Sequence, residues 1–331
     1  MPPESPRNDR QEHPKPHRAG ESHAPGETGS PLRAAGGLEP PRVPGPVEAE
    51  LLGELGPGWE SRMCPLAGGG ALRVLEGGEG PPVVLLHGRG NAASMWFPLL
   101  PELARGHRVL AVDLPGFGSS SVPQGTLRTA EDGLRYFVEP VEAMLSELAP
   151  GPMTLVGHSL GGLVSLELAL RGRVPVERLV LVDSMGLGPE MAMDARLFFR
   201  LGPERVARVL GPKLFGRIAP LPDTPVNRRL MALAYELLTV PRGRPEATRA
   251  FNTLVPLTGG VFHRFERLDE VKQPTLLFWG EHDTVLPVSL AEAAEKALPH
   301  ARLARVPAGH SPHLEVEGSL IRSREFAAQP S

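Results

Sequence analysis

One serine in this chain stands in a pattern suited to covalent catalysis. The pattern reads Gly157-His158-Ser159-Leu160-Gly161. An apolar run from Met153 to Val156 precedes it, and a helical pattern from Leu160 to Leu170 follows it. Strand, tight turn and helix in this order expose a serine hydroxyl as a nucleophile. Glycines lack a Cβ, so the strand and the helix can approach closely around the turn. The pattern predicts that Ser159 is the nucleophile of an acyl-transfer reaction.

A serine nucleophile needs a base, and the base needs an acid to orient it. Asp283 follows a buried-strand pattern, Thr275 to Trp279, which Gly280 ends. His310 follows a second strand pattern, Arg302 to Val306, and comes directly after a glycine. We therefore predict that His310 is the base and Asp283 its orienting acid.

Both assignments have competitors in the sequence. Asp183 ends the strand pattern Arg178 to Val182 and is an alternative acid. His282, His300 and His313 are alternative bases, and His313 is the strongest because it falls in the same loop as His310. The glycine before His310 favours His310, and the long stretch around Asp283 favours that acid.

A developing oxyanion needs two backbone donors. The N–H of Leu160 is one candidate, because it follows the nucleophile. The other is the N–H of Arg89, in the turn His87-Gly88-Arg89-Gly90 after the apolar run Val83 to Leu86. We expect a structural role for His87 beneath the loop. The Arg89 side chain, if exposed there, either binds an acidic substrate group or points to solvent.

Together these motifs resemble the α/β-hydrolase superfamily, from about Arg62 to Phe326. The matching pieces are His87 to Gly90, Asp113 to Ser119, Gly157 to Gly162, Trp279 to Asp283 and Gly309-His310. The resemblance implies Ser/Asp/His chemistry in the order Ser159, Asp283, His310. Within this set Asp113 is expected to be a structural turn residue that follows the strand Val109 to Val112.

The resemblance specifies the chemistry better than the substrate. Similar motifs occur in carboxylesterases, in meta-cleavage-product C–C hydrolases, in cofactor-free haloperoxidase-like enzymes and in acyltransferases. Our main prediction is a serine hydrolase acting on a small, largely apolar ester. C–C hydrolysis or acyl transfer by the same triad is the first alternative, although the loop at residues 87–94 departs from the Ser-Gly-Pro-Gly-Ala pattern common in C–C hydrolases. A non-catalytic ligand-binding member is the second alternative.

The composition of the chain excludes several classes of function. The 331 residues carry a net charge of −3, which gives no electrostatic footprint for nucleic acid. The single cysteine, Cys64, rules out an internal disulfide, and we read it as structural in a cytoplasmic protein. No apolar run approaches the length of a membrane span, and no Cys/His spacing suggests a metal site. We expect a small-molecule substrate and no cofactor, and the oligomeric state stays open.

The chain divides into four predicted parts. Residues 1–46 are crowded with Pro, Gly and charged residues, and we predict a disordered tail. Residues 47–184 and 263–327 are expected to form the two parts of an α/β core. Residues 185–262, rich in Met and Phe and interrupted by prolines at 203, 212 and 220, are predicted to be an inserted helical cap.

Strand patterns alternate with helical patterns through most of the core. Besides those given above, strands are expected at Arg62–Leu66, joined by the turn 67–70 to Leu72–Leu75. A helix is expected at Glu131–Leu148, with a kink at Pro140. This alternation predicts an α/β fold with a doubly wound, mostly parallel sheet of about eight strands. Ligands bind such sheets at the carboxyl ends of the strands, where Ser159, Asp283 and His310 all fall.

Overall fold

The structure, a computed structural model, describes residues 43–121, 125–217, 221–239 and 245–316. Most of the predicted tail, the proline at 220 and the last residues of the predicted core lie outside this part of the chain. The end of the predicted tail does not: a helix, α1, begins at Pro46 and runs to Glu54.

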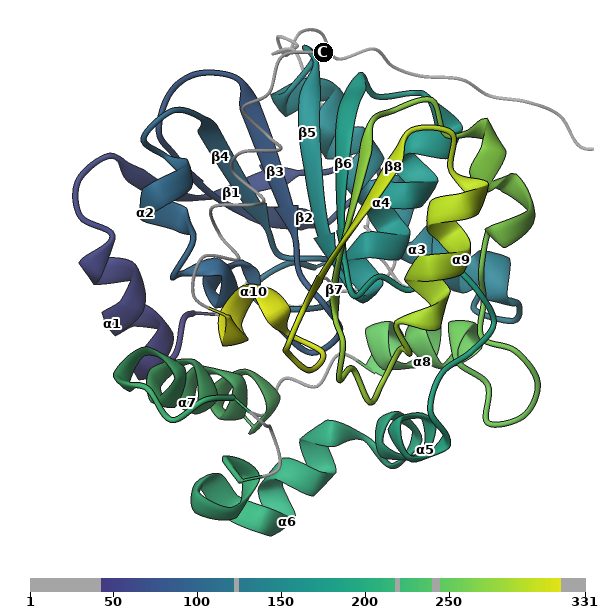
Figure 1. Cartoon of the computed structure of the whole chain (residues 1–331). Helices are drawn as coiled ribbons and strands as arrows, with labels where there is room; N and C mark the ends of the chain where they lie inside the picture. Colours follow the sequence, from purple (N-terminus) through teal and green to yellow (C-terminus); the bar gives the residue numbers. More distant parts are fainter. Residues whose placement is uncertain (1–42, 122–124, 218–220, 240–244, 317–331) are drawn as a thin grey trace, which may run out of the picture. The chain divides into compact units, whose positions relative to one another are not determined.

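The centre of the fold is one eight-stranded sheet, as predicted (Figure 1). Its strand order is β1-β2-β4-β3-β5-β6-β7-β8, and every pair from β4 to β8 is parallel, whereas β1–β2 and β2–β4 are antiparallel. The strands are β1 (Trp59–Pro65), β2 (Ala71–Gly77), β3 (Pro82–Leu86), β4 (Arg108–Val112), β5 (Met153–His158), β6 (Val176–Val182), β7 (Thr275–Gly280) and β8 (Ala301–Val306).

The inner parallel strands are continuous apolar runs because both of their faces are covered. All residues of β5 and β7 are buried. The predicted strands at the antiparallel edge were too short, since β1 starts at Trp59 and β2 continues to Gly77. β1 is mostly exposed and pairs only with β2, so its sequence carries little apolar signal.

Helices cover both faces of the sheet. One face packs against α3 (Ala130–Leu148), α4 (Leu160–Arg171) and α9 (Ser289–Ala297), and the other packs against η1 (Ala93–Trp96) and α2 (Leu100–Leu103). α3 begins with a capping box between Thr129 and Asp132 and continues as one helix through Pro140. The doubly wound architecture expected from the alternating patterns is therefore present.

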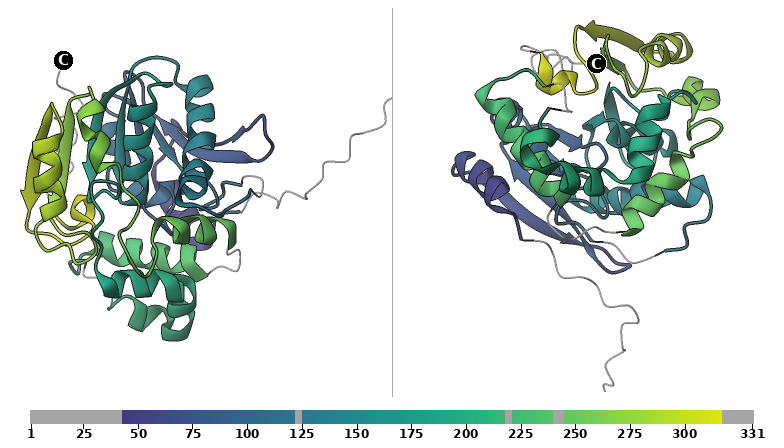
Figure 2. Two further views of the ribbon diagram at one scale, coloured as in Figure 1. Left: turned by 90° about the vertical axis from the view of Figure 1, so that its right-hand side faces the viewer. Right: turned by 90° about the horizontal axis from the view of Figure 1, so that it is seen from below.

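Among the described residues between β6 and β7, four α-helices precede η2 (Phe265–Glu270), and we call these four the helical insertion. They are α5 (Met193–Leu201), α6 (Pro203–Phe215), α7 (Pro225–Thr239) and α8 (Pro245–Leu254). The insertion gathers at the end of the sheet where the parallel strands finish (Figures 1 and 2). Pro203 opens α6, and Gly211 with φ of 68° bends the same helix just before Pro212.

The insertion leaves and rejoins the core at one place. Gly186 and His263 form an isolated parallel bridge, in which the Arg264 N–H donates to the Gly186 carbonyl at 2.8 Å. The Arg196 guanidinium adds bonds to the carbonyls of Met191 and Gly259. Both ends of the insertion are thereby held together.

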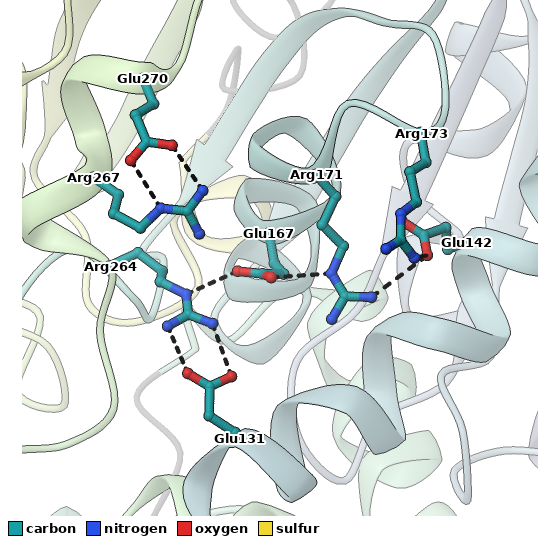
Figure 3. A network of polar contacts seen from close by, with 8 residues as sticks. All are labelled: Glu131, Glu142, Glu167, Arg171, Arg173, Arg264, Arg267 and Glu270. Atoms are coloured by element: carbon teal, nitrogen blue, oxygen red, sulfur yellow. Dashed lines mark hydrogen bonds and ion pairs between the residues drawn. The ribbon is translucent and has the colours of Figure 1, made fainter.

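A network of ion pairs fastens the returning segment to the core (Figure 3). Arg264 donates to Glu167 on α4 at 2.8 Å and to both carboxylate oxygens of Glu131 on α3. Glu167 also accepts from Arg171, so the buried carboxylate has an arginine on each side. The other labelled members are Glu142, Arg173, Arg267 and Glu270. The network joins α3 and α4 to Arg264, the residue directly before η2, and within η2 Arg267 pairs with Glu270.

Over the described residues, no helix combines the length and the apolar character needed to cross a bilayer. The remaining helix, α10 (Pro312–Glu315), follows β8 and lies beside the loop that carries His310.

Candidate active site

Ser159 occupies the turn between β5 and α4 in a conformation that few residues adopt. Its φ is 53° and its ψ is −114°. Among the described non-glycine residues, only Ser159 and Asp183 have positive φ. Hydrogen bonds hold the turn: the Ser159 N–H donates to Val182 at 3.0 Å, and its carbonyl accepts from Met185 at 3.0 Å. Strain of this kind persists where the surroundings fix it, which is typical of a functional turn.

The two flanking glycines are required by close backbone approach. A Cβ on Gly157 would lie 2.4 Å from the carbonyl oxygen of Gly161. A Cβ on Gly161 would lie 2.1 Å from the carbonyl oxygen of Leu86 at the end of β3. Both contacts are with backbone atoms, which cannot change rotamer as a side chain can. Any other residue at these positions would therefore displace the turn that carries Ser159.

Asp283 and His310 form a hydrogen-bonded pair. Asp283 Oδ2 lies 2.8 Å from His310 Nδ1, while Asp283 Oδ1 accepts the N–H groups of Val285 at 2.7 Å and Leu286 at 3.0 Å. The Asp283 side chain is fully buried, and 21% of the His310 side chain remains exposed. The acid holds the proton on Nδ1, so the exposed side of the ring presents Nε2 as its basic nitrogen.

Asp183, the alternative acid, has another environment. Its Oδ1 accepts the N–H of Gly280 at 2.9 Å, and its Oδ2 is buried without a hydrogen-bond partner among the described residues. Burial, and then the nearby charge of Asp283, raise the pKa of the Asp183 carboxyl well above its ordinary value. In the structure His310 bonds to Asp283 through Nδ1 and not to Asp183.

The alternative histidines do not share the environment of His310. His282 and His300 are exposed. His313 is buried, with its ring 4.7 Å from those of Trp96 and His158. Burial lowers the pKa of His313 to about 3. A group that stays neutral throughout the neutral pH range is a poor proton acceptor.

Two further contacts fix the His310 loop. His158 Nε2 donates to the His310 carbonyl at 2.7 Å, and Glu315 accepts the N–H groups of Gly309 at 2.6 Å and Ser311 at 2.9 Å. Burial also lowers the pKa of His158 well below its ordinary value, so this ring is neutral. The sequence analysis missed Glu315; its only signal is an acid in the short segment after His310.

The turn that carries Ser159, the loop at residues 87–94 and the loop that carries His310 meet. A Cβ built on Gly88 would lie 3.3 Å from Ser159 Cβ and 2.9 Å from His158 Nδ1. The ring centroids of His158 and His310 are 5.0 Å apart. Within the part of the chain that is described, no hydrogen bond joins the Ser159 hydroxyl to His310. Such bonds are often long without substrate and shorten when it binds.

Leu160 is the first residue of α4, so its N–H has no acceptor within the helix. The Arg89 side chain is only 2% exposed although the whole residue is half-buried, so the accessible part of Arg89 is its main chain. Both predicted oxyanion donors therefore belong to groups free of secondary-structure pairing. His87 is structural as expected: its Nδ1 donates to the Gly88 carbonyl, and its Nε2 accepts from Leu114.

Two structural predictions from the sequence have clear outcomes. Asp113 accepts the N–H groups of Ala93 at 2.6 Å and Ser119 at 2.7 Å, as a turn residue does. The exposed position considered for the Arg89 side chain is wrong. Its guanidinium is buried against Glu204 of α6 at 2.9 Å.

One group of side chains resembles a metal site. Ligand atoms of His158, Asp183 and His310 all lie within 4.8 Å of one another. However, His158 Nε2 and His310 Nδ1 are already used in hydrogen bonds. These bonds compete with any ion, and the absence of a metal stays a prediction.

Comparison with known proteins places this arrangement in context. A family model of the alpha/beta hydrolase fold matches residues 81–316. The chain is 33% identical over 237 residues to 2-hydroxy-6-oxo-6-(2'-aminophenyl)hexa-2,4-dienoic acid hydrolase of Metapseudomonas resinovorans, covering 68% of this chain and 76% of the relative. It is 31% identical over 258 residues to pimeloyl-[acyl-carrier protein] methyl ester esterase of Nitrosomonas europaea, covering 76% and 97%. The solved carboxylesterase CesB from Bacillus subtilis shares the fold, with a TM-score of 0.67 and 21% identity over 86% of this chain and 97% of that chain.

Proposed function

The chain belongs to the alpha/beta hydrolase family, and from this premise we propose that it is a serine hydrolase of small, largely apolar esters. Ser159 is the nucleophile, His310 the general base, and Asp283 the acid that orients the base. The reaction requires no cofactor, since all three groups come from the chain.

The pair formed by Asp283 and His310 carries this proposal. Two backbone N–H groups occupy one carboxylate oxygen of Asp283, which leaves the other for His310 Nδ1. A buried, anchored carboxylate both fixes the imidazole tautomer and stabilises the imidazolium that forms during the reaction. The rival acid Asp183 has no bond to His310, and burial raises its pKa, which disfavours the charged form that the mechanism needs.

The chemical steps follow from these positions. The Ser159 hydroxyl attacks the ester carbonyl and gives its proton to His310 Nε2. The N–H groups of Arg89 and Leu160 stabilise the resulting oxyanion. His310 then protonates the departing alcohol, which leaves an acyl-enzyme. Water, deprotonated by His310, attacks the acyl group, and collapse of the second intermediate returns the proton to Ser159.

The helical insertion serves as the cap in this proposal. It lies over the carboxyl ends of the strands (Figure 1), and Ser159 directly follows one of them, β5. It also brings aromatic side chains toward the loop at residues 87–94. Phe199 of α5 and Phe251 of α8 both lie beside the Arg89 guanidinium. Apolar walls of this kind favour an acyl or aryl group and exclude water during the reaction.

C–C bond hydrolysis by the same residues is a second candidate. The observation in its favour is the 33% identity to the hexadienoic acid hydrolase of Metapseudomonas resinovorans. The esterase of Nitrosomonas europaea supports the ester reaction with almost its whole length covered. The two reactions share the nucleophile and the base, so substrate tests separate them.

Labelling with a fluorophosphonate, followed by mass mapping and run beside a p-nitrophenyl ester series, tests the proposal. We expect label on Ser159 and ester turnover, both lost in Ser159→Ala. The matched control Ser146→Ala removes an exposed hydroxyl from α3 and should retain both. Label without ester turnover would favour C–C hydrolysis. A folded protein that takes no label would contradict the serine mechanism.

A further inference from the structure

The proposed reaction uses the main chain of Arg89 but not its side chain. From the loop beside Ser159, the guanidinium extends into the helical insertion, where Nη2 donates to Glu204 of α6 at 2.9 Å. Only 2% of the side chain is exposed. A long cationic side chain is seldom buried so completely unless its charge is paired.

The buried guanidinium is incompletely paired. Its Cζ lies 5.7 Å from the ring centroids of both Phe199 and Phe251, so its surroundings are largely apolar. Its Nε is buried without a hydrogen-bond partner among the described residues. Burial lowers the pKa of Arg89 below its ordinary value even though Glu204 acts in the opposite direction.

Arg73 shows how a buried arginine is compensated by two carboxylates in the same molecule. It is equally buried and its Nη2 also lacks a hydrogen-bond partner among the described residues, but Glu48 and Asp113 both pair with it, at 2.6 and 3.3 Å. Together these two carboxylates raise the pKa of Arg73 above its ordinary value. One carboxylate therefore leaves Arg89 short of a second acceptor, in a loop whose Gly88 lies directly against Ser159.

We propose that the Nε edge of Arg89 binds a carboxylate carried by the substrate, an inference that rests on the proposed hydrolase function. A guanidinium binds a carboxylate through two parallel N–H groups, and the unpaired Nε–H supplies one of them. The same residue donates its main-chain N–H to the oxyanion. The carboxylate is thus held at about one arginine side-chain length from the scissile carbonyl, and the preferred substrate is an acid ester rather than a neutral one.

Glu204 acts as the resident counterion of this site. Its side chain is 23% exposed, in contrast to that of Arg89, so it has a path toward solvent when a substrate carboxylate arrives. A buried ion pair contributes little net stability. Exchange of one carboxylate for another therefore costs the fold little.

Binding of a matched acid and amide tests the inference without relying on turnover. Pentanoate and pentanamide have nearly the same size, and NMR titration measures their dissociation constants for the full chain. We expect the wild-type protein to bind pentanoate roughly tenfold to hundredfold more tightly, the range of a charge-assisted hydrogen bond. The preference should disappear in Arg89→Gln and in the double variant Arg89→Gln/Glu204→Gln, which leaves no unpaired buried carboxylate.

Arg205→Gln is the matched control, because it makes the same charge change at an exposed position next to Glu204. It should keep the preference for pentanoate. Equal binding of the two ligands by the wild-type protein, or a preference that survives in the folded double variant, would overturn the inference. Fluorophosphonate labelling of Ser159 in the same sample judges the hydrolase function separately, so the two failures are distinguishable.

Discussion

Replacing Asp283 with asparagine tests the charge at the centre of the proposed mechanism. The wild-type carboxylate accepts three hydrogen bonds and is fully buried. Asparagine keeps the size and can still accept the two backbone N–H groups through its oxygen. It then faces His310 Nδ1 with an N–H group, which favours the wrong tautomer. The substitution therefore removes the charge and the orientation with little change in volume.

The expected magnitude follows from the charge that His310 gains in the transition state. Two unit charges about 4 Å apart interact by about 4 kcal/mol at an effective dielectric constant of about 20. A loss of about 4 kcal/mol corresponds to roughly 10³-fold in rate. We expect kcat/KM for a p-nitrophenyl ester to fall by about this factor, with the thermal unfolding transition retained.

Asp183→Asn is the matched control. Burial and the charge of Asp283 raise the pKa of Asp183, which disfavours its charged form, and the uncharged amide of asparagine keeps the oxygen that accepts the Gly280 N–H. Asparagine also tolerates the positive φ of this position. Ester turnover should stay within a few-fold of wild type. If Asp283→Asn stays within tenfold of wild type while Asp183→Asn loses activity, the acid is Asp183 and our reasoning is refuted.

Three further outcomes concern the stability of the fold. Gly161→Ala places a Cβ 2.1 Å from a backbone oxygen of β3 and should lower the free energy of unfolding, measured in urea, by about 1–3 kcal/mol. The control Gly106→Ala places a Cβ with no atom within 4 Å and should change the free energy of unfolding little. Equal effects of the two substitutions would contradict the close approach. The His313 pKa is about 3 in the folded state, so the unfolded state binds more protons between about pH 6.5 and 3. The free energy of unfolding should therefore decrease as the pH is lowered through this range, by up to about 1.4 kcal/mol per pH unit from this group. His313→Phe should reduce that slope, and an unchanged slope would speak against a neutral buried ring. Arg264→Ala should destabilise the protein more than Arg267→Ala, because the ion pair of Arg267 is local and exposed. If chemical denaturation ranks the two variants in the opposite order, the network in Figure 3 does not fasten the segment after the insertion to the core.

Much of the site was predictable because of strand geometry. Ser159, Asp283 and His310 each follow a strand, and parallel strands end at one edge of the sheet, so their proximity follows from the pattern. Their catalytic roles stay predictions. The choice between Asp183 and Asp283 was harder because both follow neighbouring strands, β6 and β7, and the contacts that distinguish them, above all the bond to His310 Nδ1, are long-range.

Other features had no local signal. The burial of Arg89 depends on α5, α6 and α8, helices more than a hundred residues further along the chain, whose packing leaves no periodic mark near residue 89. The helix α1 was not predicted as a helix, and only its first residue, Pro46, fell within the predicted tail. Its buried Glu48 is held by Arg73 of β2, a long-range contact that the sequence does not reveal.

The position of the helical insertion has an evolutionary consequence. It departs after β6 and returns to β7, two strands that are hydrogen-bonded neighbours, and the bridge between Gly186 and His263 joins its ends. Residues can therefore be added to or removed from it without altering the order or register of any strand. Ser159, Asp283 and His310, which we propose for bond cleavage, all lie outside it. A change of substrate preference can thus be confined to one continuous segment of the chain.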